Sequence, residues 1–172
     1  LEACRQKGLR IYGQAVTTDA GFTFTFEDWN LFDDSAAWCE ATTGSHAEKL
    51  AKLADPARRH ALRTQPPTTV LYSFDEVFVI EVLRQDLKPF ENLTLAEVAE
   101  RTGKHPVDAM LDLAVADDLH TTFYLPGLNR RPDLLQELVD YDWAIFGVSD
   151  GGAHTKFFTA GRFPTETLTK MV

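Results

Sequence analysis

The sequence has few of the residues and patterns that several large protein classes require. Its two cysteines, Cys4 and Cys39, lack metal-ligand spacing and are too few for a disulfide framework, so we expect two reduced thiols. The longest apolar runs, such as residues 77–80, are far too short to cross a bilayer, and no positively charged stretch followed by an apolar one opens the chain. We therefore expect a cytoplasmic protein without a membrane partner.

Positive charge is also scarce. The 17 lysines and arginines are outnumbered by 26 aspartates and glutamates, which gives a formal net charge of -9 without any basic stripe. Because attraction to a phosphate backbone needs such a stripe, nucleic acid is not an expected partner. The chain also lacks a Gly-x-Ser-x-Gly nucleophile motif and a glycine-rich phosphate loop, so nothing indicates a serine hydrolase or a nucleotide-binding protein.

What the chain does contain is enough apolar sequence for a folded core. Of its 172 residues 44% are hydrophobic and 25% charged, as in a globular domain. Apolar periodicity predicts buried strands at residues 9–16 and 143–148, shorter strands at 69–73 and 121–125, and helices at 46–64 (broken at Pro56), 94–103, 106–115 and 132–141. Residues 1–7 resemble the end of a helix stopped by Gly8 and residues 165–172 the start of another, so we expect a fragment of a longer chain.

Two of these helices carry specific signals. Thr94 and Glu97 have the spacing of a capping box, and Gly103 is a typical residue at a helix end. The next helix is predicted to begin at Pro106 and to bury one apolar stripe, with Asp108 and Asp112 pointing away from it. The stripe consists of Val107, Met110, Leu111, Ala114 and Val115. We interpret this stripe as core, not as a cofactor site.

Strands that alternate with helices favour an α/β fold with parallel strands. Two arrangements are open: a doubly wound sheet, or a partial TIM-type (β/α)8 barrel made of roughly the later strands and helices. A long aromatic-rich connection, which includes Phe22 and Trp38, follows the first strand. We interpret residues 17–64 as an insertion or lid, whose rings either wall a binding pocket or form an exposed patch in a truncated chain.

Asp150 is the strongest catalytic candidate. The segment Ser149-Asp150-Gly151-Gly152 follows the last predicted strand, and the carboxyl ends of parallel strands are where α/β proteins build their sites. A carboxylate there could bind a metal or transfer a proton. Aspartate and glycine also form ordinary turns, so the residues alone leave both interpretations open.

Residues 93–164 resemble the D-aminoacylase (N-acyl-D-amino-acid deacylase) branch of the metal-dependent amidohydrolase superfamily. The resemblance lies in the helical stretch that begins Leu93-Thr94-Leu95-Ala96-Glu97, in Gly147-Val148-Ser149-Asp150-Gly151-Gly152-Ala153-His154, and in Gly161-Arg162-Phe163-Pro164. It implies that the chain is the C-terminal half of a catalytic TIM barrel. The implied activity is hydrolysis of the amide bond of N-acyl-D-amino acids by a zinc-activated water.

The same resemblance implies roles for single residues. Asp150 would act as general base and then as general acid, and could also be a metal ligand; Arg162 would hold the substrate carboxylate. The family's His-x-His pair does not occur here, because all five histidines are isolated. The remaining zinc ligands are therefore expected outside this chain, before Leu1, and zinc is not expected to bind this chain alone.

Other candidates keep two interpretations each. His154 could contact substrate or belong to loop structure, and Tyr124 could donate a hydrogen bond at the pocket mouth or simply pack. His105, before Pro106, and His120, before a predicted strand, are each predicted to be a cap or surface residue and not a ligand. The expected partner is a small N-acyl amino acid, and a homo-oligomer is possible. Two alternatives stay open: a cyclic amidase of the dihydroorotase or hydantoinase kind, and a catalytically incomplete fragment with a binding or structural role.

Overall fold

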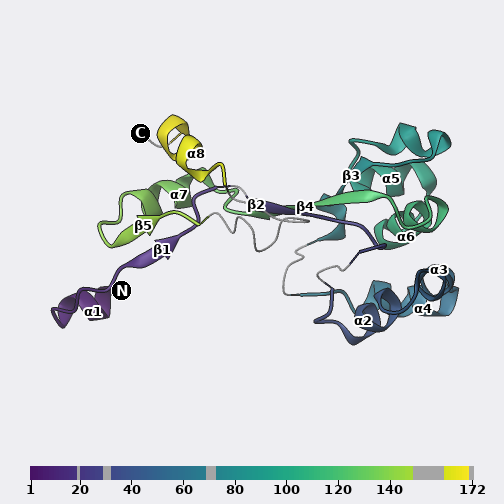
Figure 1. Cartoon of the computed structure of the whole chain (residues 1–172), viewed down its shortest axis with the longest axis horizontal. Coiled ribbons are helices and arrows are strands. Elements are labelled where there is room, and N and C mark those ends of the chain that lie inside the picture. The colour runs from purple at the N-terminus through teal and green to yellow at the C-terminus, as the bar shows by residue number, and fades with distance from the viewer. Residues whose placement is uncertain (19, 29–31, 69–72, 149–160, 171–172) are drawn as a thin grey trace. The chain divides into compact units, whose positions relative to one another are not determined.

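The computed structural model describes the whole chain except residues 19, 29–31, 69–72, 149–160 and 171–172 (Figure 1). The fold is mixed α/β, as predicted. Its strands form two small sheets among the described residues: one pairs β1 with β5, and the other has the order β2-β4-β3. The chain divides into two compact units. The first unit is Leu1–Phe22 with Gly127–Val172, and the second unit is Thr23–Pro126. A partial barrel stays a prediction.

Helices dominate the second unit. Its elements are α2 (Ala36–Thr42), α3 (His46–Ala54), α4 (Pro56–Thr64), the 3-10 helices η1 (Phe74–Glu76) and η2 (Gln85–Phe90), β3 (Phe78–Glu81), α5 (Leu95–Thr102) and α6 (Pro106–Ala116). Strands β2 (Ala20–Phe24) and β4 (Thr122–Leu128) each run across a boundary between the units. The predicted strand at 69–73 lies outside the described residues, apart from Ser73, which caps η1.

The aromatic rings of the long connection form the core of the second unit. Phe26, Phe32 and Trp38 are at most 1% exposed, and Phe24 is 5% exposed. The ring centroids of Phe32 and Trp38 lie 4.9 Å apart, edge to face, and the indole N–H of Trp38 donates to the carbonyl of Leu62 at 3.1 Å. The prediction that these rings form an exposed patch is therefore wrong, because α2 and α4 cover them. That residues 17–64 are an insertion in a catalytic barrel remains a prediction.

The helix ends follow local rules. The predicted break at Pro56 is present: Asp55 ends α3 and accepts a hydrogen bond from the amide of Ala57 in α4 at 2.9 Å. Thr94 and Glu97 form the predicted capping box, and Gly103 ends α5 with a φ of 68°. These positions were predictable because the groups involved lie within one helical turn of each other.

One prediction about α6 needs correction. The apolar stripe is buried as expected, apart from Val115, which is only half-buried. Asp108 and Asp112 lie off this stripe, as predicted, and both have ion-pair partners outside α6. Asp108 forms an ion pair with Arg63, and Asp112 forms ion pairs with Arg59 and Lys104. Periodicity places both carboxylates off the apolar stripe but contains no information about the arginines that α4 brings alongside.

The first unit contains α1 (Glu2–Gln6), β1 (Gly13–Ala15), α7 (Pro132–Val139), β5 (Ala144–Phe146) and α8 (Phe163–Lys170). The helix stop at Gly8 is present, with a φ of 70°. Strand β1 pairs parallel to β5, with Gly13 opposite Ala144 and Ala15 opposite Phe146. This parallel pairing is what the alternation of strands and helices predicted, but the predicted strand at 121–125 corresponds to β4, which pairs antiparallel with β3.

Both predicted strands of the first unit are shorter and less buried than expected. Residues 9–12 lie outside β1, and the side chains of Ile11 and Tyr12 are 46% and 51% exposed. Ile145 in β5 is 55% exposed, so the prediction of a fully buried strand is wrong. Parallel strands normally have both faces covered. Here each strand has one neighbour among the described residues, so apolar composition overestimated burial.

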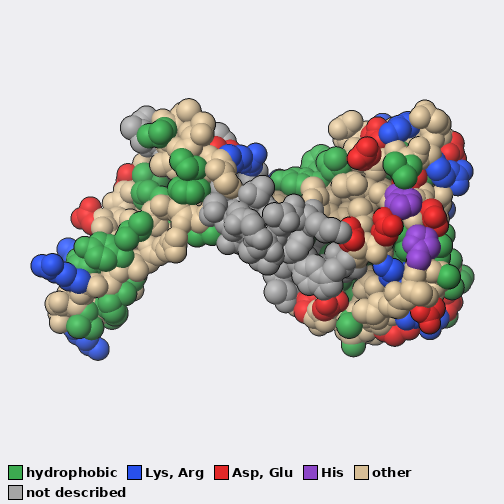
Figure 2. Space-filling model, in the orientation of Figure 1, with side chains coloured by type: hydrophobic (Ala, Val, Ile, Leu, Met, Phe, Trp, Pro, Cys, Tyr) green, Lys and Arg blue, Asp and Glu red, His purple; other side chains and the backbone are tan. Residues whose placement is uncertain are grey.

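Over the described part of the chain, none of the helices has the length and apolar character that a membrane crossing requires. On the visible face formed by α3 to α6, acidic and basic side chains intermingle (Figure 2). This face shows no single-sign patch.

Candidate functional site

The strongest sequence candidates, Asp150 and His154, lie outside the described residues. The structure does describe the strand that leads to them. Strand β5 ends at Phe146, and Gly147 and Val148 continue the chain toward Ser149. Because β1 and β5 are parallel, the residues after Ala15 and those after Phe146 leave the sheet at the same end. This carboxyl end of the sheet is where α/β proteins place ligand and catalytic groups.

Gly147 occupies a conformation and a space that suit glycine. Its φ is 135°, and a Cβ atom there would lie 2.9 Å from the ring of Phe163 in α8. Its amide donates to the carbonyl of Ala15 at 3.2 Å, and its own carbonyl accepts from the side-chain amide of Gln14. Both the amide and the carbonyl of Gly147 are therefore fixed by hydrogen bonds to β1.

Polar side chains gather just after the end of β1. Asn129, with a φ of 66°, donates from its side-chain amide to the carbonyls of Val16 at 2.7 Å and Thr18 at 3.2 Å. The hydroxyls of Thr17 and Thr167 lie 3.4 Å apart. We call Thr17, Thr18, Asn129 and Thr167 the strand-end cluster. It brings together residues far apart in the sequence at the end of β1.

The strand-end cluster is uncharged; Thr17 and Thr18 are buried, whereas Asn129 and Thr167 are half-buried. Thr17 is 2% exposed and Thr18 is fully buried. Within the described part of the chain, the hydroxyl of Thr18 has no hydrogen-bond partner. Hydroxyls and amides can orient a ligand or a loop by hydrogen bonding, but none of these groups can act as a general base near neutral pH. Sequence reasoning missed these residues, although two consecutive threonines directly after an apolar strand were a visible signal.

Arg162 is described and lies directly before α8. Its Nε atom lies 3.0 Å from a carboxylate oxygen of Glu166, one helical turn later. The Arg162 side chain is 58% exposed, whereas that of Glu166 is 14% exposed. A substrate carboxylate at Arg162 would thus have to share the guanidinium with Glu166.

Tyr124 lies on β4, opposite Phe78 of the antiparallel neighbour β3, with ring centroids 6.5 Å apart. This contact favours the packing interpretation. Tyr124 belongs to the second unit and Arg162 to the first. Because Asp150 and His154 lie outside the described residues, neither unit contains two of the predicted site residues in its described part.

The described histidines have structural partners. His105 accepts from the amide of Val107 at 3.2 Å and so caps α6, as predicted. His120 lies on the surface of the second unit and pairs with Glu27 at 2.9 Å, while His46 pairs with Asp118 at 2.8 Å. Over the described ranges, no three histidine, cysteine or acidic side chains are grouped so that they could hold a metal ion. Cys4 and Cys39 are free thiols, each half-buried.

The carboxyl groups whose pKa values are shifted lie in helix caps and surface ion pairs. The pKa of Glu97 is lowered by hydrogen bonds from the backbone and hydroxyl of Thr94, and that of Glu40 by Arg58 and Lys52. Burial raises the pKa of Asp112, but hydrogen bonds from Lys104 and Arg59 outweigh it and leave the pKa below its usual value. Perturbed groups often mark functional sites, yet these partners show that the shifts stabilise the fold.

Comparison with protein-family models, with curated proteins and with solved structures finds no match for this chain.

Proposed function

We propose that this chain is the later part of a metal-dependent amidohydrolase that hydrolyses the amide of N-acyl-D-amino acids, with Asp150 as its proton-transfer residue. The observation that carries the proposal is the place of Ser149-Asp150-Gly151-Gly152, which begins three residues after the end of a strand in a parallel pair. A carboxylate that follows a parallel strand is at the end of the sheet where such chemistry is usually built.

The surroundings of β5 support this proposal. Gly147 is held by the backbone of β1, by the side chain of Gln14 and against the ring of Phe163. A catalytic group needs a support that stays fixed during the reaction, because small displacements reduce rates strongly. In the proposed reaction Asp150 takes a proton from the attacking water and transfers it to the departing amine.

Arg162 is the proposed contact to the substrate carboxylate. Its guanidinium presents paired N–H donors that match two carboxylate oxygens. Its exposure of 58% supports the role, since a buried guanidinium would have no access to a substrate. In this proposal, Glu166 orients Arg162 through the contact at 3.0 Å.

The described residues do not supply a zinc site. The family resemblance implies zinc, but the described parts of the chain contain no group of three potential ligands. The proposal for this chain therefore rests on Asp150 and Arg162. The remaining metal ligands are proposed to lie outside this chain.

The test is the change Asp150→Asn in the protein that carries this chain. We expect the hydrolysis of N-acetyl-D-amino acids, measured as released amine, to fall about a thousandfold, the range that general acid–base groups contribute. Bound metal, measured by elemental analysis, should change little if Asp150 transfers protons and does not hold the metal. Asp142→Asn is the matched control, because Asp142 is exposed and belongs to the same unit.

Turnover measured with different substrates distinguishes the proposed activity from related ones. Turnover of hydantoins or dihydroorotate without turnover of acyl-D-amino acids would replace this proposal with a cyclic amidase. Near-normal hydrolysis by the Asp150→Asn variant would refute the role of Asp150. A protein with no turnover of either substrate class would contradict the enzymatic proposal as a whole.

A further inference from the structure

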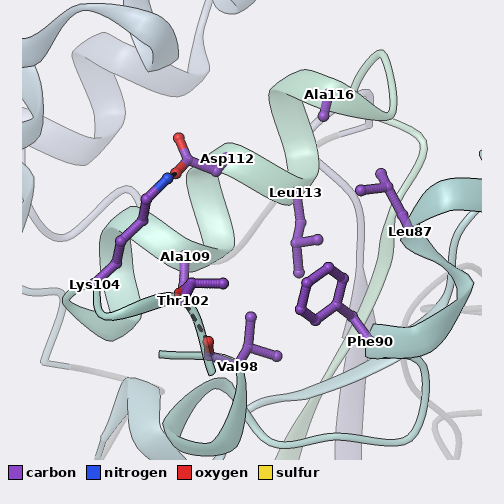
Figure 3. A pocket seen from close by; sticks show the side chains of 9 residues that line it. All are labelled: Leu87, Phe90, Val98, Thr102, Lys104, Ala109, Asp112, Leu113 and Ala116. Carbon is purple, nitrogen blue, oxygen red and sulfur yellow. Dashed lines mark hydrogen bonds and ion pairs between the residues drawn. The ribbon is translucent and has the colours of Figure 1, made fainter. Parts of the chain in front are cut away.

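The second unit contains a cavity of about 160 Å³ between η2, α5 and α6 (Figure 3). Leu87 and Phe90 approach it from η2, Val98 from α5, and Leu113 from α6. The hydroxyl of Thr102, also on the wall, donates to the carbonyl of Val98 at 2.8 Å. Apart from Lys104 and Asp112, the side chains on these walls are therefore apolar or already hydrogen-bonded.

Its size matches a small apolar group. A space of about this volume can hold a benzene ring, which makes van der Waals contacts with apolar walls. The cavity lies beside a well-packed core, since Leu113 and Ala109 of α6 are 4% and 2% exposed. A ring or a short alkyl chain is thus the group that this space favours.

Two charged side chains line the cavity in addition to the apolar ones. Lys104 and Asp112 both line it, and they form an ion pair. Asp112 is also paired with Arg59, so two cations surround one carboxylate. A ligand ammonium would meet this excess of positive charge, whereas a ligand carboxylate would be attracted to it.

Lys104 has hydrogen-bonding capacity left for such a carboxylate. An ammonium group has three N–H donors. Asp112 is the acceptor that Lys104 has among the described residues, and the Lys104 side chain is 50% exposed. A second carboxylate can therefore reach the ammonium from solvent without displacing Asp112.

We infer that this cavity binds a small monocarboxylate with an aromatic or short aliphatic body, the body lying between η2, α5 and α6 and the carboxylate on Lys104. The inference stands on the geometry of the second unit alone. It is independent of the proposed amidohydrolase activity.

The test is a titration of the 172-residue chain with sodium benzoate, followed by the methyl signals of Leu87, Val98, Ala109 and Leu113 in carbon–proton NMR spectra. We expect these signals to shift together with a dissociation constant on the order of 1 mM, which suits so small a ligand. Benzamide has nearly the same shape without the charge, and acetate has the charge but only a methyl group, which is too small to fill the cavity. Both should bind about tenfold more weakly or not at all.

Two variants separate the parts of the site. Lys104→Gln should weaken benzoate binding about tenfold, whereas Lys7→Gln, an exposed lysine of the first unit, should not change it. Ala116→Leu should fill part of the cavity and abolish binding, while the amide spectrum verifies that the variant is folded. Absent or scattered methyl shifts, equal binding of benzamide or acetate, or unchanged binding by either site variant would each overturn the inference.

Discussion

At the scale of single residues, Asp117 illustrates a carboxylate whose surroundings assign it to structure. It is 2% exposed and accepts from the backbone amides of Leu83 at 3.0 Å and Arg84 at 2.9 Å. It also accepts from the hydroxyl of Thr121 at 3.0 Å. With these donors in place, the carboxylate holds the turn after β3 against the end of α6 and has no catalytic role in our interpretation.

Replacing Asp117 with alanine should therefore destabilise the protein strongly. We expect the free energy of unfolding to fall by about 3 kcal/mol, because buried amides lose a charged acceptor. Urea denaturation followed by circular dichroism measures the change. Glu100→Ala removes an exposed carboxylate of the same unit and should change stability by less than about 0.5 kcal/mol. Equal effects of the two changes would contradict the role of Asp117.

Arg162 allows a kinetic prediction at the same scale. In the proposed enzyme, Arg162→Gln should raise KM for an N-acyl-D-amino acid about tenfold or more and change kcat much less, because the guanidinium holds a group that does not react. Arg5→Gln, an exposed arginine of the first unit, is the control. A fall in kcat with an unchanged KM would show that Arg162 does not hold the substrate carboxylate.

At the scale of elements, the contact of α4 with α6 combines a buried apolar stripe with ion pairs. Arg59 and Arg63 of α4 reach Asp112 and Asp108 of α6. Such partly exposed pairs add little stability each, so the apolar side chains of α6 provide most of the binding between the helices.

The lowered pKa of Asp112 sets the sign of a pH effect on this contact. Because the folded-state pKa lies below the unfolded value of about 3.9, the stabilisation is present above about pH 4 and is lost as the pH falls through the folded pKa. Asp112→Asn should therefore flatten the acid side of the stability curve, measured as urea midpoints between about pH 2.5 and 7. Glu100→Gln should leave the curve unchanged, and an unaltered acid limb in Asp112→Asn would refute the linkage.

At the scale of the whole molecule, the two units differ in how much apolar surface they bury. Among the described residues, Ala15 is the buried apolar side chain of the first unit, and the other buried apolar side chains belong to the second. Apolar burial is the main favourable term in folding. The second unit should thus resist local opening better than the first.

Hydrogen exchange followed by mass spectrometry tests this difference. We expect the amides of α6 and β3 to exchange on the order of a hundredfold more slowly than those of β1 and β5, because local opening is easier where fewer apolar contacts must break. Equal protection of both units would show that the described contacts do not determine local stability.

Local sequence patterns determined much of this protein's secondary structure. The break at Pro56, the capping box of Thr94 and Glu97, the glycine at the end of α5 and the apolar stripe of α6 were all predictable. Each depends on groups within about one or two helical turns of each other, so spacing along the chain is enough to reveal it.

Only the tertiary structure decided which side chains meet across long separations. Burial of Trp38 against α4, the ion pair of Arg59 with Asp112, and the bond from Asn129 to the carbonyl of Val16 join residues from distant parts of the chain. The exposure of Ile145 and the cavity beside Lys104 likewise depend on which elements pack together. Periodicity records which face of an element is apolar but not which partner covers it, and therefore these features required the folded chain.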